Sequence, residues 1–172
     1  MSTRSATIVR QRTYTSENDY TYDELFRFYR HCDGYPEGHG MDMARAFGAA
    51  EAEGTADHDR WIAYGLNNRN WCQWCFARLF SSDCDLEVEP RDCQHWDIEY
   101  LYVVTGDGEQ YGGKHNIDQL PVTIAVYDAR KIRPWKEDYT DNPEWSYEAL
   151  MGFDPIYEGS PAGFALRFGG ER

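Results

Sequence analysis

Residues 21–40, TYDELFRFYRHCDGYPEGHG, contain the change of pattern from which the fold can be worked out. Along residues 21–31 the side chains alternate between two faces, and Phe26 and Phe28 share one of them. A period of two residues is typical of a β-strand. We therefore predict a strand over residues 21–31 with both phenylalanines on the core side.

A turn and a helix are predicted to follow this strand. The dipeptide Asp33-Gly34 favours a tight turn, and Pro36 fixes its own φ angle. Apolar residues then recur every three or four positions, which predicts a helix over residues 40–53. A second helix is predicted over residues 59–80, where apolar residues again recur near helical spacing.

The remaining segments predict the rest of one sheet. Strand-like patterns occur in residues 5–14, 84–89, 97–104, 121–130 and 156–160. Ser160 and Pro161 are typical of a helix start, and the short helix that they predict ends near Phe168. We predict a single α+β domain over residues 1–172: a mainly antiparallel sheet with two or three helices packed on one face.

The charge of the chain disfavours some classes of partner. The 172 residues include 30 acids and 17 bases, a net charge of −13. A field of that sign repels nucleic-acid backbones and membrane surfaces and attracts basic proteins. No run of about 18 apolar residues predicts a membrane span, and the N-terminal residues do not resemble a secretory signal. We therefore expect a cytoplasmic protein without direct nucleic-acid or membrane binding.

The turn region also carries a resemblance. The sequence TRS at residues 3–5 and the sequence YRHCDGYPEGHG at residues 29–40 resemble a family of small uncharacterised bacterial and phage proteins with an N-terminal TRS and a YxxxDGYPEGxG turn. Looser similarity extends to residues 99–104, 122–128 and 156–164. The resemblance implies an accessory, phage-borne protein, and it assigns no catalytic residues.

The same turn offers candidate catalytic residues: His31, Asp33, Glu37 and His39. A histidine held by a carboxylate is the usual proton-transfer pair, so these residues could serve a hydrolase or a nucleotide-handling enzyme. The alternative is architectural, because Asp and Gly turn the chain and Glu37 or His39 could cap the next helix. We favour the architectural interpretation, since no serine or lysine nucleophile is adjacent.

Cysteine and histidine residues provide a candidate zinc site. Its possible ligands are Cys72, Cys75, Cys84, Cys93 and His95. The pair Cys72 and Cys75 falls in a helical pattern, whereas structural zinc sites usually hold their first pair on a turn. Free cysteines are also among the most buried residues. We therefore expect buried, reduced thiols and no cofactor, with zinc as the alternative.

Acidic and aromatic residues occur together in several segments, above all in residues 134–146. Such a surface is suited to a basic, arginine-rich partner. The predicted binding residues are Tyr35, Asp138, Tyr139, Asp141, Glu144 and Trp145. The leading hypothesis is a small acidic accessory protein, encoded by a phage, that binds a basic host protein such as a nucleic-acid-handling or defence component.

Overall fold

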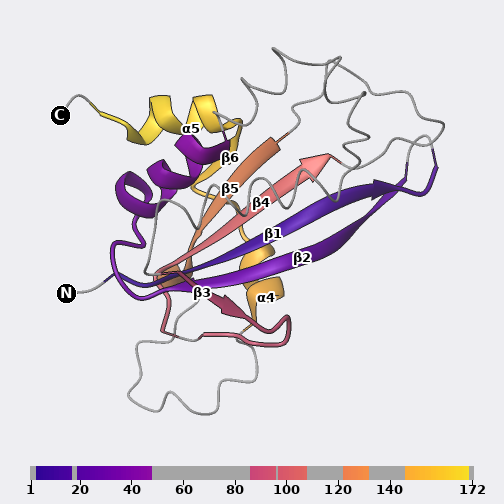
Figure 1. The fold of residues 1–172 in the computed structure, drawn as a ribbon, viewed down its shortest axis with the longest axis horizontal. Coiled ribbons are helices and arrows are strands. Elements are labelled where there is room, and N and C mark those ends of the chain that lie inside the picture. The colour runs from indigo at the N-terminus through magenta and orange to yellow at the C-terminus, as the bar shows by residue number, and fades with distance from the viewer. Residues whose placement is uncertain are drawn as a thin grey trace.

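One six-stranded sheet organises the residues that the computed structural model describes, which are 3–16, 19–47, 86–95, 97–107, 122–131 and 146–170 (Figure 1). The strands are β1 (Ser5–Tyr14), β2 (Tyr20–Arg30), β3 (Leu86–Glu89), β4 (Tyr100–Asp107), β5 (Val122–Asp128) and β6 (Tyr157–Gly159). Their order is β3-β2-β1-β4-β5-β6. Only β1 and β4 are parallel neighbours within this sheet; the other pairs are antiparallel. The predicted single α+β domain with a mainly antiparallel sheet is therefore confirmed.

Four short helical segments are present among the described residues. They are η1 (Pro36–Gly40), which continues into the helical residues 41–47, η2 (Ala129–Lys131), α4 (Tyr147–Met151) and α5 (Pro161–Phe168). The predicted start of α5 is confirmed, because the Ser160 hydroxyl accepts a hydrogen bond from the Gly163 N–H at 3.0 Å. The predicted helix over residues 59–80 lies outside the described residues. No helix in the described ranges is long and apolar enough to cross a membrane.

Both faces of the sheet are covered by apolar side chains. Phe28 and Tyr102 pack on one face with residues 41–47 and α5. Their chain neighbours Tyr29 and Leu101 pack on the opposite face. Because consecutive strand residues point to opposite faces, an apolar pair such as Leu101 and Tyr102 requires cover on both sides.

The position of α4 differs from the prediction that the helices share one face. Tyr147 and Leu150 of α4 are fully buried against the face that carries Tyr29 and Leu101, opposite α5. No helix was predicted between residues 134–146 and the strand-like segment 156–160. A five-residue helix is too short to show a helical period in sequence, so packing on the sheet decides its formation.

Gly34 allows the turn after β2 to approach β1. Its N–H donates to the Thr3 carbonyl at 2.9 Å, and its carbonyl accepts from the Tyr102 hydroxyl at 2.8 Å. A Cβ atom at Gly34 would lie 2.7 Å from the Ser5 Cβ and 2.8 Å from the Ser5 backbone nitrogen. This contact involves backbone atoms, which cannot move aside as the end of a side chain can.

We expect Gly34→Ala to lower the free energy of unfolding by about 1–3 kcal/mol, the usual cost of overpacking. Chemical denaturation measures this change. Gly170→Ala is the matched control, because a Cβ there meets nothing within 4 Å. Equal stability of the two variants would contradict the close approach at Gly34.

Candidate metal centre

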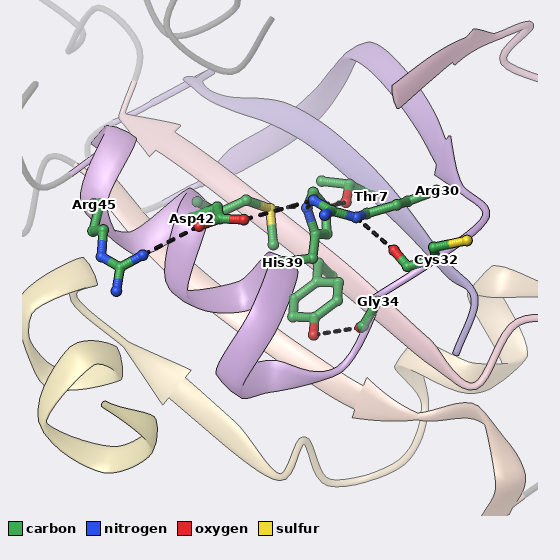
Figure 2. Close-up of polar contacts among 9 residues, drawn as sticks. Thr7, Arg30, Cys32, Gly34, His39, Asp42 and Arg45 are labelled. Atoms are coloured by element: carbon green, nitrogen blue, oxygen red, sulfur yellow. Dashed lines mark hydrogen bonds and ion pairs between the residues drawn. The ribbon is translucent and has the colours of Figure 1, made fainter. Parts of the chain in front are cut away.

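His39, one of the candidate catalytic residues, lies in a buried hydrogen-bond network (Figure 2). Its Nδ1 is 3.0 Å from Arg30 Nη1, and its Nε2 is 3.1 Å from Thr7 Oγ1. Arginine can only donate, so Nδ1 accepts and Nε2 carries the proton that is donated to Thr7. The Thr7 hydroxyl donates in turn to Met43 Sδ at 3.8 Å. Both ring nitrogens are thus satisfied by the protein itself.

The environment of His39 disfavours the charged imidazole. Burial, and to a smaller extent the Arg30 guanidinium, lowers the pKa of His39 from 6.5 to about 3. A neutral histidine that both accepts and donates fits this network, whereas an imidazolium would face a positive neighbour. His39 is therefore held as a structural group at neutral pH.

The lowered pKa predicts acid sensitivity. The unfolded chain takes up the proton near pH 6.5, whereas the folded chain does so only near pH 3, so stability falls as the pH decreases through this interval. The contribution is about 1.4 kcal/mol per pH unit. Denaturation of the parent and of His39→Asn at several pH values should show a shallower dependence in the variant. Parallel curves would contradict the neutral state of His39.

The other three candidate catalytic residues lie at the surface. His31 is exposed and forms an ion pair with Glu87, from Nε2 to Oε1, at 3.1 Å. Asp33 is exposed and has a φ angle of 55°, the left-handed conformation that Asp tolerates in turns. Glu37 is exposed in η1. The His39 backbone N–H donates to the Asp33 carbonyl at 2.9 Å, but the ring nitrogens of His39 contact Arg30 and Thr7 instead of the three predicted partners. A catalytic role for the four stays a prediction.

The predicted binding residues are only partly within the described ranges. Tyr35 is half-buried and precedes η1, where a Cβ at Gly38 would lie 3.0 Å from its ring. The other five, Asp138, Tyr139, Asp141, Glu144 and Trp145, lie outside the described residues. Binding through these residues stays a prediction.

Three potential metal ligands converge beside β3. They are Glu89, Cys93 and His95, and their ligand atoms all lie within 4.8 Å of one another. His95 Nε2 is 3.0 Å from Glu89 Oε2 and 3.5 Å from Cys93 Sγ. A single imidazole nitrogen therefore faces both a carboxylate and a thiol, as in a coordination shell. In a catalytic triad the acid and the thiol would contact different ring nitrogens.

A turn at the end of β3 brings the three ligands together. Glu89 is the last residue of β3, and Pro90 cannot donate to a strand ladder, so the strand stops there. The Cys93 N–H donates to the Pro90 carbonyl at 3.0 Å, which closes the turn. The side chains of Cys93 and His95 therefore lie next to that of Glu89.

Aromatic residues orient His95. Its ring stacks on Tyr29 with the centroids 3.9 Å apart, and its backbone N–H donates to the Tyr147 hydroxyl at 2.9 Å. The Tyr147 N–H donates to the Gln94 side chain at 3.0 Å. The ligand turn is therefore attached both to β2 and to the beginning of α4.

A buried arginine fixes the Cys93 end of the turn. The Arg27 guanidinium donates to the Cys93 carbonyl and, in two hydrogen bonds of 3.0 and 2.8 Å, to the Glu24 carboxylate. It also lies 4.9 Å from the centroid of the Tyr147 ring. Arg27 thus pairs with Glu24, positions the backbone of the site and, as a minor cause, helps to lower the pKa of Glu89.

Protons hold the cluster together when no cation is bound. A hydrogen bond to Glu89, together with burial, raises the pKa of Cys93 to about 11. Burial alone would raise the pKa of Glu89, but hydrogen bonds from Cys93 and His95 outweigh it and lower that pKa. The carboxylate is thus shared by a thiol proton and an imidazole proton. A divalent cation could take the place of these protons and bind all three groups.

The structure unites part of the predicted zinc site. Cys93 and His95 lie together, whereas Cys72, Cys75 and Cys84 lie outside the described residues. Glu89 was not predicted, because a carboxylate at a strand end among many acids carries no distinct signal. The spacing Glu-x3-Cys-x-His across Pro90 is the pattern in the sequence that could have indicated it.

Comparison with protein-family models, curated proteins and solved structures found no match for the chain. The resemblance of residues 29–40 to a bacterial and phage family therefore stays a prediction.

Proposed function

We propose that the protein binds a divalent metal ion of the zinc class through Glu89, Cys93 and His95. The observation that carries the proposal is the convergence of three different donor atoms within 4.8 Å. Thiolate, imidazole and carboxylate are the ligands that Zn²⁺ uses in proteins. The hard cations Mg²⁺ and Ca²⁺ favour sets made of oxygen alone, so the thiol and the imidazole disfavour them.

The spacing of the donors supports tetrahedral coordination. Zinc bonds of about 2.3 Å to sulfur and about 2.05 Å to nitrogen place these two atoms about 3.6 Å apart in a tetrahedron. The Cys93 Sγ and His95 Nε2 atoms are 3.5 Å apart. Glu89 Oε2 and His95 Nε2, at 3.0 Å, need only a small separation to reach the same geometry. Little rearrangement of the turn is required.

Titration of the metal-free, reduced protein with Co²⁺ tests the proposal. Co²⁺ reports a thiolate ligand through a charge-transfer band in the near ultraviolet, and Zn²⁺ should abolish the band by displacement. Native mass spectrometry should then show one zinc ion per chain. A protein that gives no charge-transfer band and retains no zinc after gel filtration would contradict the proposed function.

A second candidate function rests on the net charge of −13. We propose that the acidic surface binds a basic host protein and that the chain is a phage-encoded accessory protein. Opposite charges accelerate such an association and make it sensitive to salt. A pull-down from bacterial lysate at low salt should recover a basic protein that about 0.5 M salt releases. Recovery that does not change with salt would count against this candidate.

A further inference from the structure

We infer that the metal keeps one coordination position for an exchangeable ligand, a neutral oxygen donor such as water or the carbonyl of an amide or ester. This inference rests on the proposed metal function. Three protein ligands with an open fourth position are the pattern of catalytic zinc sites, whereas structural sites have four protein ligands. Among the described residues the cluster has three members, Glu89, Cys93 and His95.

The core side of the site offers no further donor among the described residues. Tyr29 covers one face of the His95 ring, and Arg27 and Tyr147 lie behind the turn; all three are buried. Arginine has no lone pair for a metal. The Tyr147 hydroxyl accepts the hydrogen bond of the His95 backbone N–H at 2.9 Å, so it is directed to the backbone of the turn. The core side therefore supplies support and no fourth ligand.

The solvent side of the cluster is accessible. The His95 side chain is 29% exposed and the Glu89 side chain is 11% exposed. A cation held by these two partly exposed side chains would be in contact with solvent, whereas Tyr29 and Tyr147 are buried. A ligand from solution can reach that position without passing through the core.

The charges of the site select the class of ligand. The Glu89 carboxylate and the Cys93 thiolate cancel the two charges of the metal ion. A site without net charge, on a chain with a net charge of −13, has no electrostatic preference for an anion. Arg27 is buried and bound to Glu24, and the exposed Arg91 in the ligand turn is offset by its exposed neighbour Asp92. A neutral donor is therefore favoured over phosphate or carboxylate groups.

The Co²⁺-substituted protein tests the open position, with imidazole as a neutral probe and azide as an anionic probe. Imidazole should shift the visible ligand-field bands saturably while the thiolate charge-transfer band and one cobalt per chain are retained. For the same shift of the ligand-field bands, azide should require a concentration at least about tenfold higher than imidazole. If azide shifted the bands at a lower concentration than imidazole, the assignment to neutral ligands would be overturned.

Two further outcomes separate this inference from the proposed function. Cobalt bound with a charge-transfer band, but with visible bands that neither probe shifts, would show a closed site and overturn the inference alone. Absence of any charge-transfer band would overturn the proposed function.

In the triple variant Cys72→Ser, Cys75→Ser, Cys84→Ser the charge-transfer intensity should be unchanged. A clear decrease would show a cysteine in the fourth position and overturn the inference.

Discussion

Replacement of Cys93 by serine is expected to lower the affinity for Zn²⁺ at least about 100-fold. Binding free energies for zinc in protein sites are of order 10 kcal/mol or more, so the loss of one ligand in three costs about 3 kcal/mol, which corresponds to about 100-fold. Competition with a chromophoric chelator measures the affinity. The Co²⁺ charge-transfer band should disappear in the same variant, because Cys93 is the thiolate that causes it.

Cys32 provides the matched control for this experiment. It is an exposed cysteine in the turn after β2 and does not belong to the ligand cluster. Cys32→Ser should bind zinc with the affinity of the parent and keep the charge-transfer band. If Cys93→Ser also kept both, the assignment of the metal ligands would be wrong.

Replacement of His39 by alanine is expected to lower the free energy of unfolding by about 3 kcal/mol. The variant removes an imidazole that is 1% exposed, together with its hydrogen bonds to Arg30 Nη1 and Thr7 Oγ1. Unsatisfied buried polar groups cost about 1–3 kcal/mol each, and the vacated volume adds to that cost. Urea denaturation followed by tryptophan fluorescence measures the change.

His31 is the control for the His39 variant. Its side chain is 52% exposed, and its ion pair with Glu87 lies at the surface, where such pairs contribute little. His31→Ala should therefore change stability by less than about 0.5 kcal/mol. A His39→Ala protein as stable as the parent would contradict the architectural role of His39 in the turn.

Local sequence patterns predicted most of the sheet. Strand β1 has the predicted bounds, and β5 and α5 lie within one or two residues of theirs. Of these, β5 shows a period of two residues and α5 has a Ser-Pro helix start. The parallel pairing of β1 with β4 was not predicted, because it joins residues about 95 positions apart and depends on which strand edge remains free.

The candidate site was predicted only in part. Cys93 and His95 were recognised by residue type, since thiol and imidazole are uncommon and chemically distinctive. Glu89 was missed because one carboxylate among 30 acids is not distinctive. His39 appeared as a possible base, and only its burial against Arg30 and Thr7 shows a neutral structural group.

By itself the sequence determined the two-residue period of β2 and β5, the turn at Asp33-Gly34 and the acidic character of the chain, because these depend on neighbouring residues or on simple sums. The tertiary structure alone decided that α4 covers the second face of the sheet and that Glu89, Cys93 and His95 meet. Both results depend on contacts between segments that the folded chain brings together. The distances between these side chains are set by the packing of one element on another, and a local sequence pattern contains no information about that packing.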